Sequence, residues 1–159
     1  MTVDPAREAE LAANLAEVRG RIADAARAAG RDPATVRLVG ASKTVPAEDL
    51  AVAVRLGLSD LGENRAQELL AKAPVLSELG AAPTWHFVGQ LQRNKVPALV
   101  PHVDWWHSVD RAALGEAIAK RRPGARVLVE VNLGDEPQKG GAAPEEVPPL
   151  VDEIGRAHV

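Results

Sequence analysis

The stretch LVGASKTVP at residues 38–46 ends an apolar run with Lys43, a residue that could do covalent chemistry. A lysine amine can attack an aldehyde and form an imine, provided that it is neutral for part of the time. Burial favours the neutral form by desolvation, so this chemistry predicts a Lys43 side chain that is buried at a strand end. An ordinary charged loop lysine before Pro46 is the plainer alternative, because loops after strands are exposed by default.

Polar side chains also follow the next two apolar runs. In GEN at residues 62–64, Asn64 could face a ligand, or it could form a helix capping box with Gln67. In TWHFVGQLQRNK at residues 84–95, strand alternation sends His86 to the opposite face from Trp85 and Phe87. A satisfied core histidine is the plainer reading, yet the long polar side chains of QLQRNK favour a ligand or partner surface.

Two later segments complete the set of candidates. HSVDR at residues 107–111 ends a fourth apolar run, and Asp110 is well placed to cap the next helix. EVNLGDEPQKGG at residues 130–141 places Asn132 at the end of a fifth run. Because Glu130 and Asn132 are two residues apart, they share a face of that strand.

The elements that must position these residues alternate along the chain. Apolar runs are expected to be strands at 36–41, 58–61, 85–88, 103–106 and 127–131. Helices are expected at about 5–29, 47–56, 65–79 (interrupted by Pro74), 95–100, 111–122 and 144–156. The nearly continuous apolar strands and the regular alternation predict a parallel sheet covered by helices.

Two architectures fit that alternation. A doubly wound sheet can close with five strands, whereas a (β/α)8 barrel needs eight and usually about 250 residues. No glycine fingerprint for a nucleotide follows the first strand, and the polar residues gather at the carboxyl ends of successive strands. This distribution favours an α/β fold of the (β/α)8 TIM type with about five parallel strands, a barrel whose last strands are missing.

Composition narrows the class of protein. The 159 residues carry a formal net charge of −3, which argues against a nucleic-acid surface, and they include no cysteine for disulfides or thiolate metal sites. The charged N-terminal stretch does not resemble a signal peptide, and no run approaches the roughly 18 apolar residues of a membrane span. A cytoplasmic protein that binds neither nucleic acid nor membrane is expected.

Taken together, the segments SKTVP, GENRAQELLAK, WHFVGQLQRNK, HSVDR and VNLGDEPQKGG resemble the pyridoxal phosphate homeostasis protein family, which is similar to the N-terminal barrel of alanine racemase. GRDP at residues 30–33 also fits. The resemblance covers the chain from its first helix to about residue 155. It implies that Lys43 holds pyridoxal 5′-phosphate (PLP) as an imine, and that Asn64, His86 and, more weakly, Asn132 line the cofactor.

The resemblance also implies a carrier or regulator of vitamin B6 rather than an enzyme, with PLP-dependent client enzymes as partners. The family continues for roughly one more third, through strands that supply its phosphate cup, so residues 1–159 are expected to be a single truncated domain. Such proteins are monomers at full length, whereas the truncated chain could associate. A PLP-dependent racemase and a Schiff-base aldolase are the alternatives, although the racemase would need a tyrosine that these residues do not contain.

Overall fold

The computed structural model describes residues 4–134 and 140–157. Its strands form one sheet in the order β1-β2-β3-β4-β5, and every neighbouring pair is parallel. The strands are β1 (Val39–Ala41), β2 (Asp60–Glu63), β3 (Thr84–Phe87), β4 (Val103–Val109) and β5 (Arg126–Val129). This sequential order is that of a barrel wall, whereas a doubly wound sheet reverses its order at a switch point. The expected fold class, an incomplete (β/α)8-type barrel, is confirmed.

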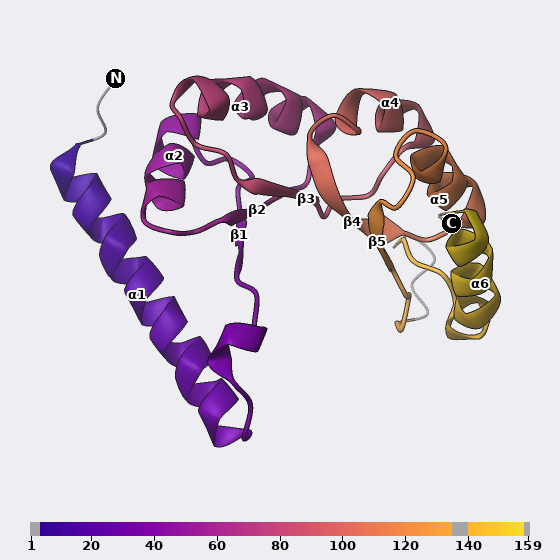
Figure 1. Ribbon diagram of the computed structural model, residues 1–159, viewed down its shortest axis with the longest axis horizontal. Coiled ribbons are helices and arrows are strands. Elements are labelled where there is room, and N and C mark those ends of the chain that lie inside the picture. The colour runs from indigo at the N-terminus through magenta and orange to yellow at the C-terminus, as the bar shows by residue number, and fades with distance from the viewer. Residues whose placement is uncertain (1–3, 135–139, 158–159) are drawn as a thin grey trace.

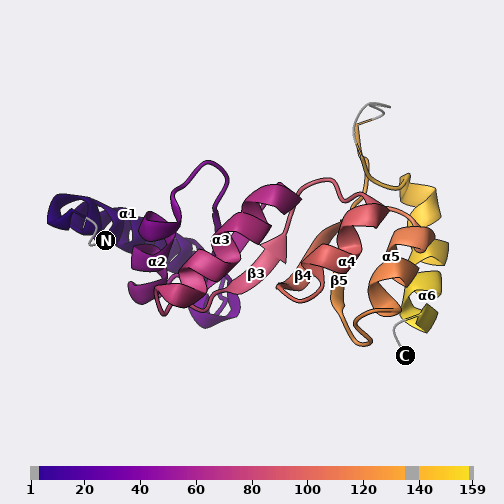
Figure 2. The same cartoon turned by 90° about the horizontal axis from the view of Figure 1, so that it is seen from above.

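Helices follow the strands along one side of the sheet, which Figure 1 shows as the outer side of an arch. Seen from above, the chain advances in one direction from α1 to α6 (Figure 2). The helices are α1 (Pro5–Ala28), α2 (Ala47–Arg55), α3 (Ala66–Glu78), α4 (Val96–Leu99), α5 (Ala112–Ala119) and α6 (Val147–Ala157), with short 3₁₀ turns η1 (Pro33–Thr35), η2 (Arg93–Lys95) and η3 (Pro144–Glu146).

Helix α1 has the ends that its sequence predicts. The Asp4 carboxylate accepts a hydrogen bond from the Ala6 amide at 3.0 Å, and Pro5 opens the helix. Gly30 follows the last turn with φ of 66°, a left-handed conformation that glycine adopts without a steric penalty.

The hydrophobic core lies between the outer face of the sheet and the helices. Trp85, Phe87 and Trp106 point into it, and Leu69 and Leu76 meet them from α3. The Phe87 and Trp106 rings lie 6.5 Å apart between centroids at a tilt of 48°, a favourable arrangement for two aromatic rings. The core therefore fixes which residues of β3 and β4 face outward, and so which face inward.

Three expectations about local structure are wrong. Helix α3 continues through Pro74, because the buried Leu69 and Leu76 anchor it on both sides of the proline. Strand β1 begins at Val39 instead of residue 36, since ladder pairing with β2 starts at that residue. Asp110 does not cap α5: the N-cap is Arg111, which forms an ion pair with the Asp110 carboxylate.

Residues 135–139, which include Lys139 of the last motif, lie outside the described part of the chain. Within that part, no helix combines the length and the apolar character needed to cross a membrane.

Candidate functional site

The strand register brings Lys43 and Asn64 to the same end of the sheet. Ala41 pairs with Gly62, and Gly62 pairs with His86, so these three residues share one level. Lys43 and Asn64 each follow two residues later on neighbouring strands. By alternation they belong to the concave face, at the carboxyl end where (β/α)8 barrels place their sites.

Lys43 is exposed, so the expectation of a buried amine is wrong for this structure. The physical reason is its position after β1, which is an edge strand of the described sheet and has no neighbour on one side. Within the described residues the Lys43 ammonium forms no ion pair or hydrogen bond, unlike that of Lys72. Because no carboxylate holds the charged form, the fraction of this amine that is neutral can attack a carbonyl group.

Asn64 is exposed, and the capping box expected for it with Gln67 is wrong. The N-cap of α3 is Arg65, which makes no side-chain capping bond. Instead the Glu63 carboxylate accepts hydrogen bonds from the Asn64 amide at 2.8 Å and from the Arg65 amide at 3.3 Å. Glu63 therefore holds the two backbone amides that precede α3, and the Asn64 side chain makes no capping bond to the helix.

His86 lies on the concave face, as alternation predicts. Its Nε2 atom is 2.9 Å from Asp60 Oδ1, and its Nδ1 atom is 2.9 Å from His107 Nε2. Because a carboxylate only accepts, His86 donates from Nε2, and its Nδ1 then accepts a hydrogen bond from the Nε2–H group of His107. Both ring nitrogens are thus satisfied by protein partners, and the His86 ring stacks on Trp105 at 5.9 Å and 3°.

The two groups that flank His86, Asp60 and His107, have shifted pKa values. Burial would raise the pKa of Asp60, but hydrogen bonds from Ser59, His86 and Arg37 outweigh it and lower that pKa. Arg37 binds the Asp60 carboxylate at 2.8 Å. Burial, and then the neighbouring His86, lower the pKa of His107. At neutral pH the folded protein therefore has an ionised Asp60 and a neutral His107.

That arrangement predicts a pH dependence of folding stability. Because the pKa of His107 is lower when folded, the unfolded chain binds more protons just below the ordinary histidine pKa of about 6.5. Stability should fall as the pH drops from 7.5 to 5.5, and a His107→Gln variant should show a smaller fall. Urea unfolding at the two pH values measures both. Asp60, whose pKa is lowered, titrates below this pH range and does not contribute to the fall. An equal loss of unfolding free energy in wild type and His107→Gln would show that His107 is not the group responsible.

Asn132 follows β5, at the opposite edge of the sheet from Lys43, so the described chain does not bring the two together (Figure 1). Its side-chain oxygen accepts a hydrogen bond from the Gly134 amide at 3.1 Å. It also lines a cavity of about 340 Å³ that includes Gln90 and Glu130.

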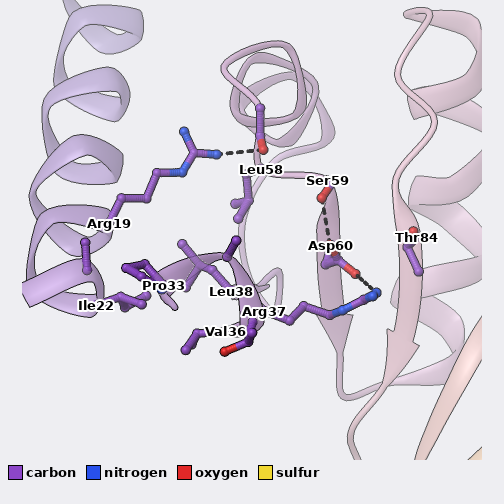
Figure 3. Close-up of a pocket in the computed structure, with 14 residues that line it drawn as sticks. Arg19, Ile22, Pro33, Val36, Arg37, Leu38, Leu58, Ser59, Asp60 and Thr84 are labelled. Carbon is purple, nitrogen blue, oxygen red and sulfur yellow. Dashed lines mark hydrogen bonds and ion pairs between the residues drawn. The ribbon is translucent and has the colours of Figure 1, made fainter. Parts of the chain in front are cut away.

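A cavity of about 660 Å³ lies at the other end of the sheet, between α1 and the start of β2 (Figure 3). Arg37 and the Ser59 hydroxyl both reach the Asp60 carboxylate in its wall. Arg19 donates to the backbone oxygens of Leu56 and Gly57. The charged side chains that line this cavity therefore already have hydrogen-bond partners in the protein. Sites in such barrels form at the carboxyl ends of the strands, so this cavity is not the candidate site.

Three residues that bind the site residues are absent from the sequence-based set: Asp60 below His86, and Glu68 and Lys72 on α3. Glu63 and His107 stand in the sequence-based motifs at the strand ends, but their partners were not predicted. Glu68 and Lys72 are four residues apart on α3, a spacing that predicts an ion pair. Their link to the strand residue Glu63 depends on the packing of α3 on the sheet. No spacing in a single sequence reveals that link.

Comparison with known proteins assigns the family. The chain is 43% identical over 148 residues to a pyridoxal phosphate homeostasis protein of Pseudomonas aeruginosa, covering 91% of this chain and 64% of that one. The chain belongs to the pyridoxal phosphate homeostasis protein family. It spans about two thirds of the length of the curated relatives that it matches. No protein-family model matches the chain.

Solved structures share the fold of the chain. A crystal structure of an unknown protein from Bifidobacterium adolescentis has a TM-score of 0.86 at 36% identity, covering 97% of this chain and 67% of that chain. PipY of Synechococcus elongatus with PLP bound has a TM-score of 0.75 at 30% identity, covering 92% of this chain and 65% of that one. The fold that the chain shares with these structures therefore extends over nearly all of its length.

Proposed function

We propose that the protein binds PLP covalently through Lys43 and acts in vitamin B6 homeostasis. The observation that carries the proposal is the position of Lys43: an exposed amine without a described partner, at the carboxyl end of β1 in a barrel-type parallel sheet. Support comes from PipY, a relative whose structure holds PLP, and from the name of the curated relatives.

Three residues at the carboxyl end of the sheet could each contact such a cofactor. When bound, PLP supplies an aldehyde that a neutral lysine amine attacks. Asn64 offers a side-chain amide that the α3 cap does not use. His86 is level with the residues two positions before Lys43 and Asn64, and both of its ring nitrogens already have protein partners. Its proposed role is to line the site below the cofactor without binding it through a ring nitrogen. Asn132 would join them only across a closed barrel.

The proposed role is carriage or regulation of the cofactor without turnover, with PLP-dependent enzymes as clients. The relatives' name, which describes homeostasis, supports this role. A racemase remains the competing function because the fold would present the same lysine. Incubating the PLP-loaded protein with an L-amino acid and measuring the D-enantiomer separates the two: a D-product that depends on Lys43 would favour the racemase.

Covalent attachment at Lys43 is the first test. After incubation with PLP, borohydride reduction and peptide mapping should place the pyridoxyl group on the peptide that contains Lys43. A Lys43→Ala variant should lose that label, whereas Lys120→Ala, which changes an exposed lysine of the α5 C-cap, should keep it.

Lys72 is the other lysine close to the candidate site, so it is the alternative position at which the label could be found. Burial would lower the pKa of Lys72, but hydrogen bonds to Glu63 and Glu68 outweigh that effect and raise it, so its amine stays protonated. Label on Lys72, or full label on Lys43→Ala, would contradict the proposed function.

A further inference from the structure

The residue after Lys43 has an unusual backbone conformation. Thr44 has φ of 63°, and among the described residues it is the one non-glycine residue with positive φ. A β-branched residue is disfavoured there, so surrounding contacts must hold it. Strain of this kind gathers where a protein needs a particular geometry, which directs attention to what holds the Lys43 turn.

A buried ammonium group lies behind that turn. Lys72 Nζ donates to the Ser42 backbone oxygen at 2.7 Å, to Glu63 Oε2 at 2.8 Å and to Glu68 Oε2 at 2.8 Å. Its side chain is only 12% exposed, and that of Glu63 is fully buried. All three donor hydrogens of the ammonium therefore have an acceptor.

The two carboxylates extend the contact to both neighbours of Lys43. The Ser42 hydroxyl donates to Glu63 Oε2 at 2.8 Å. The Thr44 amide donates to Glu68 Oε2 at 3.2 Å. The residues before and after Lys43 are thus tied to one cluster, Glu63–Lys72–Glu68, while the Lys43 side chain stays outside it.

Glu68 and Lys72 both stay ionised at neutral pH, which keeps this cluster hydrogen-bonded. The hydrogen bond from Lys72, followed by that from the Thr44 amide, lowers the pKa of Glu68. The pKa of Lys72 is raised, so the pair stays ionised and its hydrogen bonds are charge-assisted. By alternation, Ser42 points to the helix side and Lys43 to the concave side of the sheet. The cluster therefore acts on Lys43 through the backbone and not by contact with its amine.

We propose that Lys72, held by Glu63 and Glu68, is a positioning residue that fixes the 42–44 turn and so presents the Lys43 amine for covalent attachment. The inference rests on the proposed function for the reaction that it assists. Its structural half, the rigid turn, can be measured without any cofactor. A displacement of a reacting group by about 1 Å can cost on the order of 100-fold in rate, so a loosened turn should be visible kinetically.

The experiment compares Lys72→Met with wild type and with Lys120→Met. Lys72→Met keeps the length of the side chain and removes its charge, and Lys120 provides an exposed lysine without a described ion pair as the control. Two quantities are measured under native conditions: hydrogen exchange of the Thr44 amide without cofactor, and the rate constant for covalent attachment of PLP.

In Lys72→Met we expect Thr44 exchange to be at least about 10-fold faster and attachment about 10- to 100-fold slower, with the label still on Lys43. Lys120→Met should match wild type in both. If Lys72→Met attaches PLP within twofold of the wild-type rate, with unchanged Thr44 exchange, the positioning role is wrong. A merely structural role would lower the urea midpoint while leaving the attachment rate unchanged.

The outcomes separate the two proposals. If wild type never attaches PLP at Lys43, the proposed function fails, and the exchange measurement still judges the rigid turn. Should Lys72→Met not fold, Glu68→Gln replaces it, because Glu68 is at the rim with its side chain 26% exposed. That variant should speed Thr44 exchange and slow attachment by about three- to tenfold; no change in either would overturn the positioning role.

Discussion

Replacing Gly89 with alanine should destabilise the protein by about 3 kcal/mol, because backbone of another strand end fills the space that a side chain would need. A Cβ atom at Gly89 would lie 2.7 Å from the carbonyl carbon and 2.8 Å from the Cα of Asn64, and closer still to the Asn64 carbonyl oxygen. Backbone atoms cannot rotate away as a flexible side chain can. The turn after β2 would have to move.

That movement should also disturb the candidate site. The displaced turn contains the Asn64 and Arg65 amides that Glu63 holds, and Gly89 itself accepts a hydrogen bond from the buried Ser108 hydroxyl. Attachment of PLP to Lys43 should therefore slow in the fraction of Gly89→Ala that remains folded. Urea unfolding and the borohydride assay measure the two effects.

Gly20→Ala is the matched control. Gly20 lies in α1 with no atom within 4 Å of its added Cβ, so this substitution should be neutral or stabilise the helix by up to about 1 kcal/mol. A Gly89→Ala protein within about 0.5 kcal/mol of wild type would show that the two strand ends are not in tight contact.

Periodicity in the sequence was sufficient to predict the architecture and the facing of His86. Apolar runs separated by helical stretches gave the parallel sheet, and the period of two residues placed His86 opposite Trp85 and Phe87, where the structure has it. These predictions succeed because each depends only on residues close together in the chain.

Other features depend on register and tertiary packing, which a single sequence does not give. The partners of His86, Asp60 and His107, are on neighbouring strands, and only the ladder pairing brings them together. The helix cap was misassigned for a related reason. Asn64 has the side chain of a good cap, but the buried Glu63 carboxylate holds the Asn64 and Arg65 backbone amides, and α3 begins only at Ala66 with Arg65 as its N-cap.

Replacing Glu63 with leucine should give the largest loss of stability, about 3–5 kcal/mol, because it removes the fully buried partner of the Lys72 ammonium and leaves it only the partly exposed Glu68 carboxylate. Glu63 accepts hydrogen bonds from the Ser42 hydroxyl, from Lys72 and from the Asn64 and Arg65 amides. All four donors would lose this acceptor. Lys72 would keep the Ser42 backbone oxygen and Glu68, and the Ser42 hydroxyl would keep the Gly62 backbone oxygen, so the loss comes from the weakened charge pairing and from the Asn64 and Arg65 backbone amides. Glu116→Leu, at an exposed position of α5, should stay within about 0.5 kcal/mol of wild type.

The double variant Glu63→Leu/Lys72→Met tests whether the loss comes from the unpaired charge. Removing both ions of a buried pair costs less than removing one, because the buried ammonium is gone as well and the carboxylate that remains, Glu68, is 26% exposed and can be solvated. The double variant should therefore be more stable than Glu63→Leu alone, although the Asn64 and Arg65 donors keep it below wild type. Urea unfolding of the four proteins gives the coupling free energy. If the two single losses simply add, Glu63 and Lys72 act independently, and the stability of this end of the sheet does not depend on their pairing.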